Sequence, residues 1–148
     1  MREIKKCDYP VIAEMMTAYF HEAQPTVPLS NRDKFVLDPD FVLRWAKNVV
    51  SSPNIFGFID DDGMILGEIN NTWVGPNKIA NGGIWYVRPM ARSSTLGWRL
   101  LKAFDDKAHQ VALVARMALD NPSNIPIVDR MYKKIGFKEY SKIYVKEY

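Results

Sequence analysis

Apolar residues follow two different spacings along this chain, and the spacing changes repeatedly. Recurrence every three or four positions predicts four helices: one that follows Asp8, which is expected to cap it, and others at 38–52, 95–109 and 125–135. Runs rich in β-branched and aromatic residues predict strands at 2–6, 54–59, 64–73, 84–87 and 111–119, with a closing hairpin after Gly136. The predicted order is β-α-α-β-β-β-α-β-α-β-β, an α/β (α+β) fold in which helices cover a mixed sheet.

The segments between these elements are of two kinds. Residues 60–63 read Asp-Asp-Asp-Gly and predict a tight hairpin turn; they lack the spacing of a calcium loop. Residues 23–38 and 74–83 are longer, rich in Pro, Gly and Asn, and without a period, so we predict two loops that help to choose a ligand. A length of 148 residues and the absence of a linker indicate a single domain over 1–148.

The turn between the 84–87 strand and the 95–109 helix has the most distinctive chemistry. The strand stops before Pro89, and three hydroxyl residues precede the apolar stripe of the helix. Such a turn aims free backbone N–H groups and the positive end of the helix dipole at one point, which suits a phosphate. An ordinary connection in which Ser94 or Thr95 caps the helix accounts for the same residues.

Two motifs resemble those of the GCN5-related N-acetyltransferases. Val87-x-Pro89, followed by Arg92 and Gly97, is similar to the acetyl-coenzyme A (acetyl-CoA) signature of that family, in which a strand ends in Val-x-Pro before Gln/Arg-x-x-Gly-x-Gly/Ala. Thr95 stands where the first Gly of that signature is usual, and Ser93 also replaces a glycine that many members carry. Near the end of the chain, Met-Tyr-Lys-Lys-Ile-Gly-Phe at 131–137 resembles the family's Tyr-x-x-x-Gly-Phe ending, and its Lys residues and Gly136 suit a helix C-terminus.

The resemblance implies an N-acetyltransferase that moves an acetyl group from acetyl-CoA, its co-substrate, to a primary amine. Transfer would be by direct attack in a ternary complex, without a metal. Tyr132 would protonate the departing thiolate; alternatively it packs half-buried under the hairpin. The residues implied in holding the coenzyme are Trp85, Val87, Arg92, Ser93, Ser94, Thr95, Leu96, Gly97 and Asn124.

The attacking amine has to lose a proton, and the 84–87 strand carries no carboxylate to take it. Glu68, within the apolar run 65–69, is the candidate base, because apolar neighbours raise the pKa of a carboxyl group. Two alternatives stay open: Glu68 lies on the solvent face of its strand, or ordered water relays the proton.

The composition argues against some classes of binding partner. The net charge is +3 with acidic residues interspersed, which argues against nucleic acid, and no apolar run is long enough for a membrane span. The N-terminus lacks a signal-peptide pattern, and the single cysteine excludes an internal disulfide, so we expect a cytoplasmic protein. We expect the acceptor to be a small-molecule or peptide amine, but the sequence does not identify it. Whether the protein forms a homodimer also stays open. The alternative function is a degenerate relative that binds CoA or a protein partner without turnover.

Overall fold

The computed structural model describes residues 1–26, 34, 36–72, 75–118 and 125–139. Its sheet has the order β1-β2-β3-β4-β5. Neighbouring strands are antiparallel except β4 and β5, which are parallel. The strands are β1 (Arg2–Glu3), β2 (Ile55–Asp60), β3 (Gly63–Thr72), β4 (Gly75–Val87) and β5 (Val114–Arg116). The helices are α1 (Tyr9–Ala23), α2 (Pro39–Ser51), α3 (Leu96–Val111) and α4 (Ile125–Ile135).

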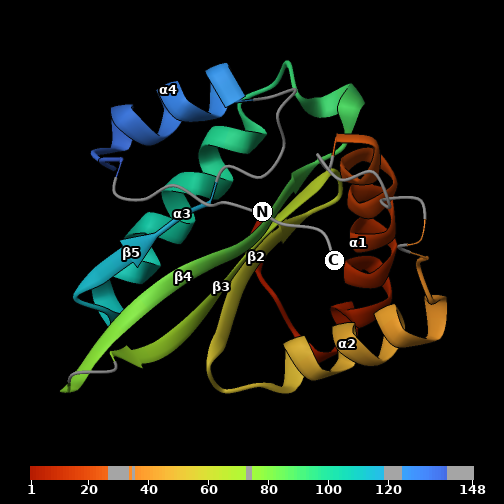
Figure 1. The fold of residues 1–148 in the computed structure, drawn as a ribbon, viewed down its shortest axis with the longest axis horizontal. Coiled ribbons are helices and arrows are strands. Elements are labelled where there is room, and N and C mark those ends of the chain that lie inside the picture. The colour runs from red at the N-terminus through yellow and green to blue at the C-terminus, as the bar shows by residue number, and fades with distance from the viewer. Residues whose placement is uncertain (27–33, 35, 73–74, 119–124, 140–148) are drawn as a thin grey trace.

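Helices cover both faces of the sheet. α1 and α2 lie on one face, and α3 and α4 lie on the other (Figure 1). Successive residues of β3 point to opposite faces, so Met64 packs in the cluster under α1 and α2 while Ile65 packs against α3. Both side chains are fully buried, as are Leu100 and Phe104 of α3. The predicted mixed sheet covered by helices is therefore confirmed.

The packing between β3 and α3 leaves no room at Gly67. A Cβ atom there would lie 2.6 Å from the ring of Phe104 and 2.6 Å from that of Phe56. These two rings are stacked with their centroids 5.3 Å apart, so neither can move without disturbing the other. The close approach of strand and helix thus depends on a residue without a side chain at this position.

We expect Gly67→Ala to lower the free energy of unfolding by about 1–3 kcal/mol, the usual cost of overpacking a core. Urea unfolding measures it. Gly75→Ala is the matched control, because no heavy atom of the described residues lies within 4 Å of its new methyl group, and its effect should stay within about 0.5 kcal/mol. Equal stability of the two variants would contradict this account of the packing.

The prediction of a loop at 74–83 is wrong, because the described residues 75–83 belong to β4. They pair with β3 in a long hairpin, with Glu68 opposite Asn81 and Asn70 opposite Ile79. Residues of low β-propensity are held here by backbone pairing with the neighbouring strand. The predicted 23–38 loop includes 27–33 and 35, which lie outside the described residues.

The N-terminal segment also differs from the prediction. The strand predicted at 2–6 is shorter in the structure, where β1 covers only Arg2–Glu3. Lys6–Asp8 then form a 3-10 turn. Asp8 does not cap α1 with its side chain. Its buried carboxylate accepts two hydrogen bonds of 2.6 Å from the Arg2 guanidinium and one of 2.7 Å from the Lys5 N–H. These bonds, chiefly those from Arg2, lower the pKa of Asp8.

We expect Asp8→Asn to lower the free energy of unfolding at neutral pH by about 1–3 kcal/mol, since the charged hydrogen bonds are lost. Because the pKa of Asp8 is depressed in the folded state, its contribution is present above the ordinary value of 3.8 and is lost as pH falls through the folded value. The variant should therefore lose less stability than the wild type on acidification below pH 4, which chemical denaturation at a series of pH values measures. If the free energies of unfolding of the two proteins fell equally with pH below 4, this role of the Asp8 carboxylate would be contradicted.

In the C-terminal part, the prediction of the helix α4 is confirmed and the prediction of the strand before it is corrected. α3 continues to Val111, and the predicted 111–119 strand shrinks to β5, preceded by the exposed Leu113. After α4, Gly136 has φ 107°, and its N–H and that of Phe137 donate to the Tyr132 carbonyl, as a left-handed helix cap requires. The hairpin predicted after Gly136 falls largely outside the described residues, which end at residue 139.

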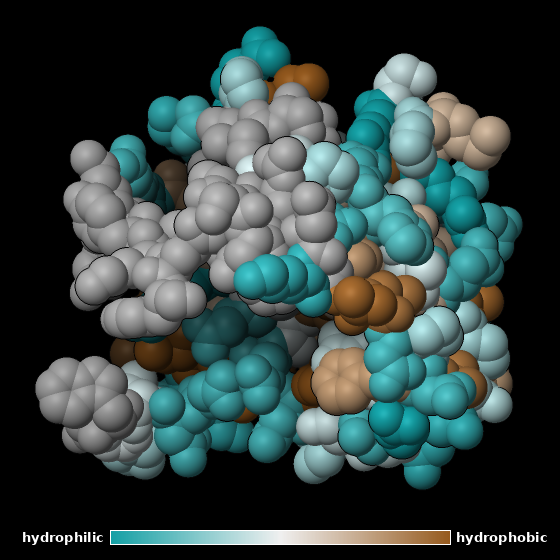
Figure 2. Space-filling view, turned by 45° about the vertical axis from the view of Figure 1, so that its right-hand side comes forward, coloured by the Kyte–Doolittle hydropathy of each residue, from teal (hydrophilic) through white to brown (hydrophobic). Residues whose placement is uncertain are grey.

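The surface over α1 and α2 is mostly hydrophilic, with single hydrophobic residues set among polar ones (Figure 2). Phe41 of α2 is one of the exposed apolar side chains of the chain. In the described part of the chain, no helix combines the length and the hydrophobicity needed to cross a bilayer.

Candidate active site

The site begins where two parallel strands part. β4 and β5 pair only from Ile79 opposite Val114 to Asn81 opposite Arg116. Beyond that point β4 continues to Val87, whereas β5 ends. An irregularity in the pairing with β3 contributes, because one residue of β3 opposes two of β4 between Gly82 and Trp85. Such a bulge bends the strand, so β4 leaves β5 and opens a gap.

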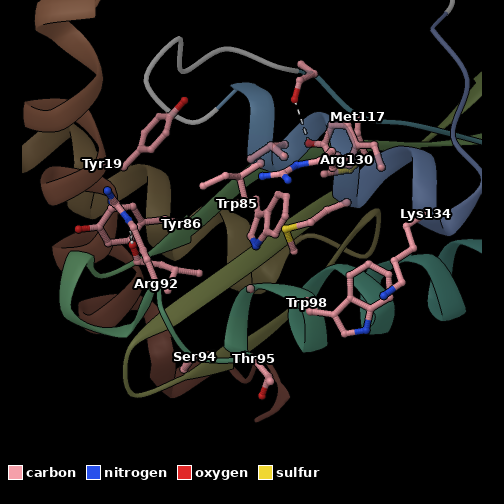
Figure 3. A pocket seen from close by; sticks show the side chains of 18 of the residues that line it. Tyr19, Trp85, Tyr86, Arg92, Ser94, Thr95, Trp98, Met117, Arg130 and Lys134 are labelled. Atoms are coloured by element: carbon pink, nitrogen blue, oxygen red, sulfur yellow. Dashed lines mark hydrogen bonds between the residues drawn. The ribbon is translucent and has the colours of Figure 1, made fainter.

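A cavity of about 620 Å³ fills this gap. Its walls come from β4, the start of α3, the inner side of α4 and the last turns of α1 (Figure 3). Seven of the predicted site residues line it: Trp85, Val87, Arg92, Ser94, Thr95, Gly97 and Tyr132. The fold thus gathers the two motifs, far apart in sequence, around one space.

The N-terminus of α3 presents unpaired amides to this cavity. The N–H groups of Arg92 and Ser94 donate to carbonyls of Pro89 and Ala91 in the 3-10 turn η4 (Pro89–Ala91), and the Leu96 N–H donates to Ser94 Oγ at 3.1 Å. Ser94, not Thr95, therefore satisfies the helix start. Within the described residues, no acceptor meets the N–H groups of four positions: Ser93, Thr95, Gly97 and Trp98. Three of these residues, Thr95, Gly97 and Trp98, line the cavity, and their N–H groups form the donor cluster expected at a helix N-terminus.

Thr95 fits the backbone of this turn. Its φ of −80° is one that any residue adopts, and no non-glycine residue described here has a positive φ. Thr95 in place of glycine therefore causes no backbone strain. Gly97 also has an ordinary helical conformation, and a Cβ there would lie 3.5 Å from the Trp85 ring, at normal contact distance.

The other residues of the predicted phosphate turn have different roles. Arg92 Nε donates to the Val87 carbonyl at 2.9 Å, and its guanidinium forms an ion pair with Glu22 of α1. The Leu96 side chain is 3% exposed and packs in the core between α3 and the sheet. Ser93 is exposed and is not among the lining residues. Arg92 therefore ties the turn to both β4 and α1.

Two aromatic residues form the middle of the cavity wall. The rings of Trp85 and Tyr132 are stacked with centroids 5.9 Å apart. The Tyr132 hydroxyl donates to the Ala118 carbonyl at 3.0 Å, the bond drawn as a dashed line in Figure 3. Trp85 Nε1 is buried without a hydrogen-bond acceptor among the described residues. A buried N–H of this kind is costly unless a ligand satisfies it.

Glu68 lies apart from this group. Its side chain is exposed, at a position where β3 pairs with Asn81 and Ile55, and it does not line the cavity. The burial among apolar neighbours that made Glu68 the candidate base is thus absent. Asn124 lies outside the described residues. No three His, Cys, Asp or Glu side chains in the described segments gather as metal ligands would.

Sequence reasoning missed the α1 side of the cavity and the cations of α4. Tyr19 and Glu22 line it from α1, and Arg130 and Lys134 from α4. Tyr86, which packs against Tyr19 with perpendicular rings 6.3 Å apart, also lines it. Burial raises the pKa of Tyr86 first, and the negative charge of Glu22 raises it further. Tyr19 belongs to the apolar stripe of the first helix, and no motif marked Glu22.

Several solved structures with the same architecture are named as acetyltransferases. A probable acetyltransferase matches with a TM-score of 0.73 and 14% identity, over 100% of this chain and 98% of the other. Aminoglycoside N-acetyltransferase AAC(6')-Iy in complex with CoA matches with a TM-score of 0.69 and 14% identity, over 99% and 92%. The chain has the GCN5-related N-acetyltransferase fold. The ribosomal-protein-alanine N-acetyltransferase from Brucella melitensis biovar Abortus 2308 is similar too, with a TM-score of 0.68 and 13% identity over 99% and 97%.

No protein-family model matches the chain, and no curated protein matches it significantly in sequence. The predicted GCN5-related N-acetyltransferase fold is nevertheless confirmed, by structure. The cavity lies where two strands of this fold, β4 and β5, part.

Proposed function

We propose that this protein is an N-acetyltransferase that uses acetyl-CoA to acetylate a primary amine. The observation that carries the proposal is the course of the cavity. It runs from the amide cluster at the α3 N-terminus, along the edge of β4 with which no described strand pairs, to the hydroxyl of Tyr132. A long ligand with a diphosphate at one end and a reacting group near its other end fits this arrangement.

The residues present suit the coenzyme. The N–H groups of Thr95, Gly97 and Trp98 would hold the diphosphate, helped by the helix dipole. Arg130 and Lys134 add positive charge at the α4 side. The edge of β4 from Gly82 to Val87 can pair with an extended amide chain as a further strand would. The unsatisfied Trp85 Nε1 supplies one more donor on this path.

Acetyl-CoA would supply an acetyl thioester. Tyr132 lines the cavity and its hydroxyl donates to the Ala118 carbonyl, so we assign to it the proton that a departing thiolate takes up. We no longer assign the base to Glu68, which lies away from the cavity. Water in the cavity takes the proton of the acceptor amine.

Titration calorimetry with CoA and acetyl-CoA, followed by a thiol-release assay with a panel of amines, tests the proposal. We expect both coenzyme forms to bind and free thiol to appear with some amines. Absence of binding to the folded protein would refute it. Binding without thiol release from any amine would favour the alternative, a protein that binds CoA without turnover.

A further inference from the structure

The charged side chains that line the cavity differ between its two ends. At one end α4 contributes Lys134, whose ammonium lies 5.0 Å from the centroid of the Trp98 ring. At the other end α1 contributes Glu22, the single carboxylate among the described lining residues. Figure 3 shows Tyr19, Tyr86 and Arg92 gathered at the α1 end and Trp98 and Lys134 at the opposite end. The basic end suits phosphates, which leaves the α1 end for the other substrate.

The α1 end already holds a cation. The Arg92 guanidinium pairs with Glu22 and lies 6.0 Å from the centroid of the Tyr86 ring. A carboxylate and an aromatic face together are the surroundings that stabilise ammonium and guanidinium groups. Because one carboxylate accepts several hydrogen bonds, Glu22 can pair with a second cation while it keeps Arg92.

The negative charge of Glu22 reaches the neighbouring ring. Burial raises the pKa of Tyr86, and the charge of Glu22 raises it further, which shows that this carboxylate lies close to the ring. Tyr19 meets this ring edge-on and gives the α1 end a second aromatic wall. The glutamate side chain is 26% exposed, so it is reachable from the cavity without being fully solvated.

We propose that the α1 end is the acceptor subsite and that it selects a small amine with one ammonium group and an apolar body. Glu22 pairs with the ammonium, and the rings of Tyr19 and Tyr86 contact the body. A polycation would find one carboxylate for several charges and would meet Arg92 and the basic α4 end. This inference rests on the proposed function, because it presupposes the coenzyme in the remainder of the cavity.

The test measures binding rather than turnover. CoA-saturated protein is titrated with 2-phenylethylamine, with its uncharged analogue 2-phenylethanol, and with kanamycin as a polycation. We expect the amine to bind at least tenfold more tightly than the alcohol and than kanamycin. Equal affinity for amine and alcohol, or a preference for kanamycin, would overturn the inference while the proposed function stands.

Two matched variants separate charge recognition from a structural role. Glu22→Gln should abolish the tenfold advantage of the amine over the alcohol. Glu14→Gln removes the other ion pair between α1 and the β4–α3 segment, that of Glu14 with Arg88 at 2.6 Å, from a residue that does not line the cavity. It should keep the advantage. An advantage that survives in Glu22→Gln would overturn the inference; failure of the wild type to bind CoA at all would overturn the proposed function with it.

Discussion

Gly97→Glu is expected to lower the affinity for CoA at least 100-fold while the protein stays folded. The new side chain would start at ordinary contact distance from Trp85 and Val87, whose side chains line the cavity, and would extend from the α3 N-terminus into it. Its carboxylate would both fill the space for a diphosphate and repel it. A 100-fold loss corresponds to about 2.7 kcal/mol, well within the value of a charged contact at a helix N-terminus combined with steric exclusion.

Gly97→Ala is the matched control for this variant. Its methyl group would lie 3.5 Å from the Trp85 ring and 3.7 Å from Val87, distances of normal packing. Alanine also favours the helix over glycine by about 1 kcal/mol, so this variant should be at least as stable as the wild type. Calorimetric titration should give it a CoA affinity within about threefold of the wild type, a change of less than 1 kcal/mol. Undiminished affinity of Gly97→Glu would place the coenzyme elsewhere.

Tyr132→Phe should reduce kcat at least 100-fold without changing the affinity for CoA. A positioned general acid commonly contributes 100-fold or more, and roughly this factor is lost when only its hydroxyl is removed. Phenylalanine keeps the stacking on Trp85 and the contact with Phe137, so the cavity wall stays in place. The hydrogen bond to Ala118 is lost as well, at a cost of about 1 kcal/mol in stability.

Steady-state thiol release, with any amine that the wild type acetylates, measures this effect. Tyr9→Phe serves as the control, because Tyr9 packs in the cluster under α1 and α2, on the other face of the sheet. It should turn over like the wild type. Unchanged kcat in Tyr132→Phe would remove this residue from the acid role, even with coenzyme binding intact.

The sequence predicted the turn before α3 and the helix end at Gly136 because both depend on local chemistry. A strand, a polar turn and a helix start follow one another between Trp85 and Gly97, and the helix end at Gly136 needs a positive φ that glycine provides. Neighbouring residues determine such features, so their order in the chain reveals them. That the turn and Tyr132 share one cavity follows from the fold that the resemblance implied.

Features that depend on contacts distant in sequence were not predictable. Residues 75–83 resemble a loop, and only pairing with β3 makes them a strand. The apolar run around Glu68 is buried on both faces near Ile65, but this burial ends at Gly67, and no local pattern marks that boundary. Glu22 reaches the cavity because α1 packs beside Tyr86 and Arg92. The position of Glu22 near the end of a predicted helix does not indicate this contact.

A titration of the ¹⁵N-labelled protein with CoA, followed in ¹H–¹⁵N correlation spectra, tests the central claim most directly. The claim is that the amides at the start of α3 hold the diphosphate. We predict that the resonances of Thr95, Gly97 and Trp98 shift the most and move downfield, as new hydrogen bonds to an anion require. If CoA binds and these three resonances stay in place while others move, the claim is contradicted.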